Sequence, residues 1–204
     1  MRIIAGDHRG RAIHGPEDMQ TTRPIIDRVK EALFNRLTSL GLLRPDGENE
    51  GWSVVDVFCG TGSLGLEALS RGAARCTFVD QDRTAVGMLN ENLDMLGLQG
   101  RAQVVQASAL AGYWSASLRP GSVQVAFIDP PYAMMEEDDP RARVLTMVEQ
   151  IKPIMEPGGV VMVRTPVVVT CEDIPGYDGP ATADYGGMRL HFYQTPMEDE
   201  DEQP

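Results

Sequence analysis

The chain has 204 residues, the length of one ordinary domain, and 42% of them are apolar, which is enough core-forming material for a globular fold. No apolar run approaches the ~20 residues of a membrane helix, and the first residues lack the apolar segment of a signal peptide. Three scattered cysteines do not fit a disulfide framework or a zinc site. We therefore expect a monomeric, reduced, cytoplasmic domain that contacts no membrane and holds no metal.

The net charge of −12, taken as a whole, argues against a nucleic-acid partner. Its distribution is uneven, because residues 1–36 are net positive and acidic runs occupy 136–139 and 198–202. The second run predicts a disordered acidic tail over residues 196–204. Four N-terminal bases are candidates for phosphate contact, and for each of them a role as a solvated surface charge or as an internal ion-pair partner stays open. They are Arg9, Arg11, Arg23 and Arg28.

Residues 1–44 form an expected N-terminal extension. Short apolar–polar stretches at 2–5 and 11–14 give a weak hairpin signal, and a polar connector, Gly15 to Pro24, follows. Apolar residues then recur at three- and four-residue spacing, which predicts an amphipathic helix from Ile26 to Leu40. Residues 44–51 are rich in Pro, Asp, Gly and Asn and read as a linker.

Residues 52–195 alternate between strand and helix patterns, which predicts a mostly parallel sheet with helices on both faces. The final stretches, Val167–Thr170 and Met188–Gln194, have no helix-length pattern between them, so we expect an antiparallel pair there. The other expected strands are Ser53–Phe58, Cys76–Val79, Ala102–Gln106, Val123–Ile128 and Val160–Arg164. The expected helices are Leu64–Arg71, Thr84–Leu96, a stretch within Leu110–Leu118, and Arg141–Met155.

A glycine loop follows the first of these strands. Gly60, Gly62 and Gly65 form a Gly-x-Gly-x-x-Gly pattern that opens a helix, and Asp80 ends the next strand. This arrangement lets the backbone approach a nucleoside cofactor, whose ribose hydroxyls the carboxylate would bind. The pattern does not distinguish NAD from S-adenosyl-L-methionine. Asp56, just before the loop, could reach the cofactor or simply cap the loop.

The tetrapeptide Asp129-Pro130-Pro131-Tyr132 follows the fourth strand. In a doubly wound sheet the first and fourth strands flank the ligand crevice, so the tetrapeptide should face the glycine loop. A carboxylate and a proline carbonyl can accept hydrogen bonds from an exocyclic amine, and Tyr132 offers a stacking surface for a base. A plain strand-ending turn is the alternative. The position of the tetrapeptide opposite the loop favours a role in presenting an amine to an electrophilic methyl group.

With these motifs in place, the chain resembles the RsmD family of 16S rRNA guanine-N2 methyltransferases, which are class-I S-adenosylmethionine-dependent enzymes. The resemblance spans roughly residues 2–193. It is carried by the tetrapeptide, by the glycine loop with the helix after it, and by Thr22-Arg23-Pro24 followed by the helix that begins near Asp27. The segments concerned are 2–6, 9–11, 22–24, 27–35, 60–73, 129–132 and 185–186.

The resemblance implies a Rossmann-like α/β fold with seven strands, the last antiparallel, preceded by a small RNA-facing extension. It also implies S-adenosyl-L-methionine as cofactor, catalysis by the tetrapeptide, and 16S rRNA or a small-subunit ribosomal particle as partner. Ser108 stands where many relatives have a cofactor-binding Asp, and Arg164 stands where an acid is common. The rivals are a DNA-adenine or protein-glutamine methyltransferase, an NAD-dependent oxidoreductase, and a non-catalytic RNA-binding scaffold.

Overall fold

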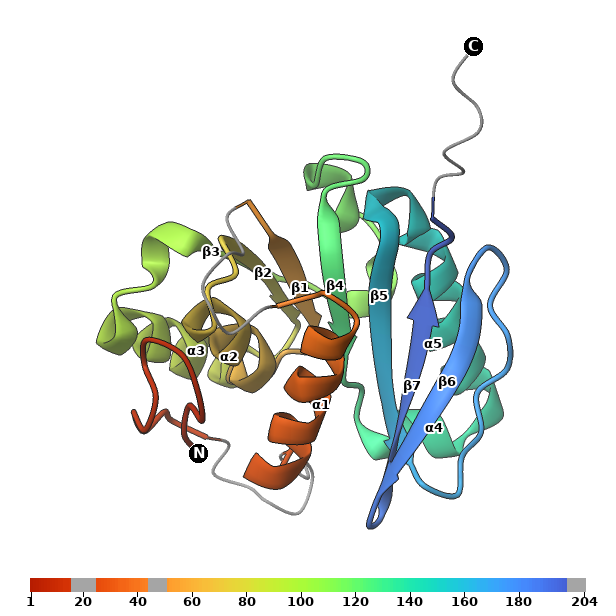
Figure 1. The fold of residues 1–204 in the computed structure, drawn as a ribbon, viewed down its shortest axis with the longest axis horizontal. Coiled ribbons are helices and arrows are strands. Elements are labelled where there is room, and N and C mark those ends of the chain that lie inside the picture. The colour runs from red at the N-terminus through yellow and green to blue at the C-terminus, as the bar shows by residue number, and fades with distance from the viewer. Residues whose placement is uncertain (16–24, 44–50, 198–204) are drawn as a thin grey trace.

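The computed structural model describes residues 1–15, 25–43 and 51–197. Its centre is a seven-stranded sheet in the order β3-β2-β1-β4-β5-β7-β6 (Figure 1). Strands β1 to β5 pair in parallel, whereas β7 is antiparallel to both of its neighbours. The strands are β1 (Ser53–Val57), β2 (Arg75–Asp80), β3 (Ala102–Gln106), β4 (Val123–Ile128), β5 (Met155–Pro166), β6 (Asp178–Tyr185) and β7 (Met188–Gln194). The predicted sheet is confirmed.

Helices cover both faces of this sheet and divide its core into two layers. On one face α1 (Asp27–Ser39), α2 (Ser63–Ser70) and α3 (Arg83–Leu96) pack with the N-terminal segment. On the other, α5 (Asp138–Gln150) packs with residues of the loop after β3, and the short α4 (Tyr132–Glu136) joins β4 to α5. None of the described helices is long and apolar enough to cross a bilayer.

Side-chain spacing explains why these elements form. The central strands are buried on both faces over β1, β4 and residues 160–163 of β5, and the sequences of these stretches are mostly apolar. In α1, Val29, Leu33 and Leu37 lie on one face and are buried against the sheet. The side chain of Asp82 caps α3 by accepting hydrogen bonds from the backbone N–H groups of its first turn.

Several predicted elements differ from the structure. The expected N-terminal hairpin is reduced to one isolated bridge between Arg2 and Ala12. The stretch within Leu110–Leu118 contains single 3-10 turns, at Ala109–Ala111 and Ser115–Ser117. The last helix begins at Asp138 and ends at Gln150, not at Arg141 and Met155, because Pro140 fits the first turn of a helix. The connector Gly15–Pro24, the linker and the acidic tail lie almost wholly outside the described residues.

The strand predicted at Val167–Thr170 is wrong. These residues form a turn in which the Val169 amide donates to the Pro166 carbonyl. Beside β5, the second antiparallel neighbour of β7 is β6, at Asp178–Tyr185. Its Gly and Pro residues are unfavourable in a strand interior, but they are tolerated here because β6 is the edge strand and lies mostly exposed.

A buried ion cluster joins the N-terminal segment to α1 and α2. The Glu67 carboxylate, on α2, accepts hydrogen bonds from the backbone amides of Ile4 and Ala5 at 2.9 and 3.0 Å. It also pairs with Arg71 at 2.8 Å and with Lys30 of α1 at 3.5 Å. All three charged side chains are buried. Because α2 begins at the glycine loop, this cluster fixes the N-terminal segment relative to that loop.

We predict that Glu67→Gln lowers the free energy of unfolding by about 3–5 kcal/mol, because it removes the anion from a buried cluster and leaves two cations uncompensated. Urea denaturation measures this loss. Arg2→Gln is the matched control, since the Arg2–Asp27 pair is largely exposed and should contribute under about 1 kcal/mol. Equal effects of the two substitutions would contradict the role assigned to the cluster.

Candidate active site

The parallel register brings four charged residues to the carboxyl edge of the sheet. Val57 of β1 pairs with Val79 of β2 and with Ile128 of β4, and Ile128 pairs with Val163 of β5. The residues that follow these partners are Asp80, Asp129 and Arg164, and Asp56 immediately precedes Val57. Side chains alternate along a strand, so the four lie on the face covered by α1, α2 and α3, as Phe78, Phe127 and Met162 do.

The glycine loop leaves β1 at this edge. Phe58 has a left-handed backbone with φ 60°, a strained conformation for a bulky residue that is found preferentially at functional sites. Gly60 also has positive φ, at 53°, and Gly62 precedes α2 as its N-terminal cap. No described atom lies within 4 Å of where a Cβ would stand on Gly60. The tip of the loop is therefore open to close approach by a ligand.

Asp80 is held against this loop. One of its carboxylate oxygens accepts a hydrogen bond from the Gly60 amide at 2.8 Å, and the other accepts from the Asp82 amide at 2.9 Å. Each carboxylate oxygen has a second lone pair, and the side chain is only partly buried. The group can therefore accept further hydrogen bonds from a diol lying across the strand ends.

Asp56 is fully buried beneath the loop and accepts a hydrogen bond from the Gly65 amide at 2.8 Å. Asp56 had two predicted roles, reaching the cofactor and capping the loop, and this contact is the one that capping requires. Burial raises the pKa of the Asp56 carboxyl well above its ordinary value, the Gly65 amide opposes that rise, and the negative charges of Asp129 and Asp80 add to it. The three carboxyl groups are thus close enough to affect one another's charge.

Asp129 forms a buried ion pair with Arg164, whose Nε donates to Oδ1 of the carboxylate. The Asp129 backbone amide donates to the Val57 carbonyl at 3.1 Å, which ties the tetrapeptide to β1. The Arg164 guanidinium also lies 5.3 Å from the centre of the Tyr132 ring. Burial raises the pKa of the Asp129 carboxyl, and Arg164 opposes that rise. Sequence reasoning noticed Arg164 only as a departure from a family pattern and missed this contact.

The remaining predicted site residues are more dispersed. Ser108 follows β3 close to the edge, since the amide of the preceding Ala107 donates to the Asp80 carbonyl at 2.9 Å. Arg9 and Arg28 have exposed side chains. Arg11 is exposed, and its guanidinium donates to the Met95 carbonyl in α3 at 2.9 Å. Arg23 lies outside the described residues.

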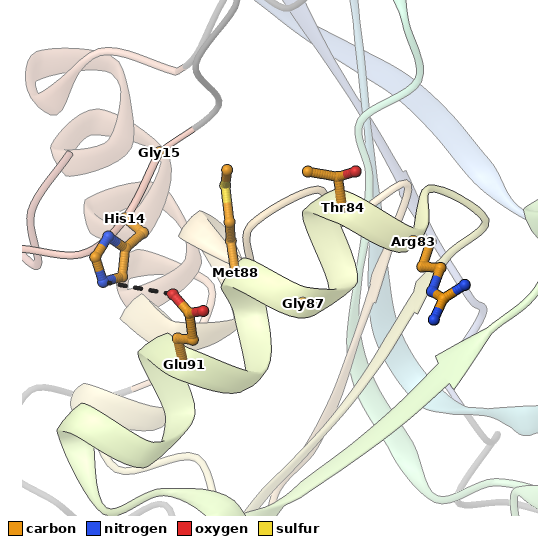
Figure 2. Close-up of a pocket in the computed structure, with 7 residues that line it drawn as sticks. All are labelled: His14, Gly15, Arg83, Thr84, Gly87, Met88 and Glu91. Atoms are coloured by element: carbon orange, nitrogen blue, oxygen red, sulfur yellow. Dashed lines mark ion pairs between the residues drawn. The ribbon is translucent and has the colours of Figure 1, made fainter.

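A cavity of about 450 Å³ lies beside this edge, between the end of the N-terminal segment and the outer side of α3 (Figure 2). At its wall the His14 ring approaches the Glu91 carboxylate at 3.8 Å. Its lining contains none of the predicted cofactor or catalytic residues. The lining residues are His14, Gly15, Arg83, Thr84, Gly87, Met88 and Glu91.

Comparison with known proteins shows which family the chain belongs to. A family model described as "Conserved hypothetical protein 95" matches residues 1–194. The ribosomal RNA small subunit methyltransferase D of Haemophilus influenzae is 34% identical over 170 residues, which cover 77% of this chain and 83% of that protein. Its namesake in Escherichia coli K12 is 38% identical over 139 residues, covering 67% and 64%. The chain belongs to the RsmD family.

A solved structure of a putative methyltransferase supports the same assignment. The Escherichia coli protein YhhF superposes with a TM-score of 0.75 at 28% identity, and the match covers 97% of this chain and 99% of that one. The predicted family, the Rossmann-like methyltransferase fold and the assignment as an rRNA methyltransferase are therefore confirmed. The roles of the individual site residues remain predictions.

Two glycines of the RsmD loop should respond differently to substitution. A Cβ on Gly65 would stand 2.3 Å from Phe78 and 2.6 Å from Cys76, so Gly65→Ala should lower the free energy of unfolding by about 1–3 kcal/mol through overpacking. Gly60→Ala meets no such neighbour and should cost only the about 1–2 kcal/mol of a left-handed non-glycine residue.

Thermal and urea unfolding of both variants check this difference, and cofactor titration checks its consequence. Gly60→Ala should weaken cofactor binding in a chain that still folds. If Gly60→Ala binds the cofactor as tightly as the unsubstituted chain, the loop tip is not where the ligand lies.

Proposed function

We propose that the chain transfers a methyl group from S-adenosyl-L-methionine to the exocyclic N2 amino group of a guanine in 16S rRNA. The observation that supports this most directly is that the two motifs lie at the same carboxyl edge of the sheet. Asp80 and the glycine loop stand at the ends of β2 and β1, and the tetrapeptide stands at the end of the adjacent β4. A bound sulfonium and a target amine would therefore meet over one crevice. Membership of the RsmD family supplies the substrate class.

The cofactor would lie across the ends of β1, β2 and β3. Gly60 and Gly62 would allow its close approach, and the Asp80 carboxylate would accept hydrogen bonds from its ribose hydroxyls. Asp56 and Gly65 would support the loop from beneath, since the hydrogen bond between them joins β1 to α2 on the two sides of the loop. Ser108, at the exit of β3, would lie near the adenine end. When bound, the cofactor supplies an electrophilic methyl group on a positively charged sulfur.

The tetrapeptide would hold the guanine. The Asp129 carboxylate and the Pro130 carbonyl would accept hydrogen bonds from the two hydrogens of the amine, and Tyr132 would stack against the base. Neither Pro130 nor Pro131 has an N–H to compete for these acceptors. The amine lone pair, otherwise delocalised into the ring, would then face the methyl group. Asp129 would accept the proton that the nitrogen releases on taking the methyl group that the cofactor would supply.

The base must leave its stack to reach this crevice, and positive charges near the edge would position the RNA. The first turn of α1 lies on the side toward which β1 and β4 point (Figure 1). Arg28 is the second residue of α1 and is exposed. Arg9 is exposed on the N-terminal segment that Glu67 anchors. Arg11 and Arg23 complete the proposed set. We propose that the partner is 16S rRNA, free or within a small-subunit particle, and that the chain acts as a monomer.

The direct test is mass spectrometry of digested 16S rRNA from cells with and without the gene. N2-methylguanosine should fall by one residue per rRNA molecule in the deletion strain and return on complementation. An unchanged content of this nucleoside would refute the rRNA assignment. Methyl incorporation into DNA or protein by the purified chain would favour the other amino-directed enzymes, and calorimetric binding of NAD alone would favour an oxidoreductase.

We predict that Asp129→Ala lowers the turnover number by about 10²–10³-fold, because it removes a hydrogen-bond acceptor from the reacting amine. Cofactor affinity should be unchanged, because Asp80 and the loop remain intact. Asp138→Asn is the matched control, since Asp138 also pairs with an arginine but at an exposed position. Methyl-transfer rates and calorimetry measure both effects, and full turnover by Asp129→Ala would contradict the proposed role and favour a non-catalytic scaffold.

We predict that Arg28→Ala and Arg9→Ala each weaken rRNA binding and reduce the slope of log affinity against log salt by about 1, as expected for loss of one phosphate contact. Arg119→Ala is the control, because exposed Arg119 precedes β4 and lies at the opposite edge of the sheet. Filter binding over a salt series measures the slopes. Identical slopes for all the variants and the unsubstituted chain would exclude the phosphate contacts.

A further inference from the structure

Arg164 contacts both the first and the last residue of the tetrapeptide, Asp129 and Tyr132. Its Nε donates to the carboxylate of Asp129, and its guanidinium lies over the ring of Tyr132. The arginine reaches both from β5, because the pairing of Ile128 with Val163 places the next residue of each strand side by side. Only 7% of the Arg164 side chain and 17% of the Asp129 side chain are exposed, so water screens the ion pair weakly.

This arrangement has a chemical consequence for the amine site. A carboxylate accepts hydrogen bonds through both oxygens, whereas a protonated carboxyl group also donates one. A protonated Asp129 would present a hydrogen to the substrate amine where an acceptor is required. The site therefore needs a group that keeps this buried carboxyl ionised, and a planar guanidinium that bonds the carboxylate and lies over an aromatic ring can do this while fixing the geometry of both.

The other charged and titratable groups around Asp129 do not keep its carboxyl ionised. From β1, Asp56 lies nearby, but burial raises the pKa of its own carboxyl well above the ordinary value, and Asp80 of β2 stands beyond it. From α4, Tyr132 contributes its ring. Among the residues that the structure describes, Arg164 of β5 is the one cation that perturbs Asp129, and it opposes the rise in the pKa of Asp129 that burial causes.

We propose that Arg164 is a positioning residue for the target amine, holding Asp129 as an ionised acceptor and aligning Tyr132 for stacking. This inference rests on the proposed function for its catalytic consequence, but its electrostatic part concerns the free protein. Arg164 is not required to touch the substrate. Methyl transfer should therefore depend on pH through Asp129 once the guanidinium is removed.

The test compares Arg164→Met, which removes the charge, with Arg164→Lys, which keeps the charge but loses the planar group. Arg189→Met is the matched control: Arg189 stands on the neighbouring β7 and pairs with Asp184 at an exposed position. In the free proteins, carbon-13 NMR follows the side-chain carboxyl of Asp129, whose signal is identified by its loss in Asp129→Asn. Single-turnover methyl transfer is then measured from pH 5 to 9, with cofactor affinity measured by calorimetry.

Arg164→Met should move the titration midpoint of Asp129 upward by about 1–3 pH units, the usual effect of losing an adjacent opposite charge. The acidic limb of its rate profile should move by the same amount, so that its rate is recovered as pH rises, while cofactor affinity stays constant. Arg164→Lys should keep the midpoint near that of the unsubstituted chain but transfer methyl more slowly at every pH. Arg189→Met should change neither.

An unchanged Asp129 midpoint in Arg164→Met would overturn the proposal, as would a uniform rate loss without a pH shift. If Arg164→Met does not fold, Arg164→Lys decides: a rate profile and an absolute rate equal to those of the unsubstituted chain would refute the role of the planar group. If 16S rRNA is not the substrate, every protein fails the turnover assay, including the unsubstituted chain, whereas the NMR titration still reports on the ion pair.

Discussion

The parallel register of β1, β2 and β4 is the constraint on which the site depends. The Asp129 amide donates a hydrogen bond to the Val57 carbonyl, and the Cys59 amide donates one to the Val79 carbonyl. Both β4 and β2 are therefore joined to the end of β1, where the glycine loop begins. Carboxyl ends of adjacent parallel strands must meet at one edge. The register therefore brings together a loop that a nucleoside can approach and a tetrapeptide that can hold an amine.

Burial and charge then act together at this edge. Three carboxyl groups stand near one another at this edge, and burial raises the pKa of two of them, Asp56 and Asp129. Each has a different partner: the Gly65 amide for Asp56, two loop amides for Asp80, and the Arg164 guanidinium for Asp129. These partners fix the orientation of each group.

Local sequence patterns predicted the sheet, its helices and the chemical motifs, because glycine loops, strand periodicity and the tetrapeptide act over a few residues. They failed where distant pairing decides the outcome. An exposed edge strand such as β6 can contain Gly and Pro, so its sequence resembled a loop, and the apolar turn at Val167–Thr170 resembled a strand. The contacts of Arg164 with Asp129 and of Glu67 with the N-terminal amides depend on which strands and helices become neighbours, which no local pattern contains.

The most direct measurement is a crystal structure of the chain with S-adenosyl-L-homocysteine, the demethylated product of the proposed cofactor. The account predicts that its ribose hydroxyls donate hydrogen bonds to Asp80 and that its homocysteine part lies along the glycine loop. Its sulfur should face Asp129 and the ring of Tyr132. A ligand found instead in the cavity beside α3, with its sulfur directed away from the tetrapeptide, would contradict the account.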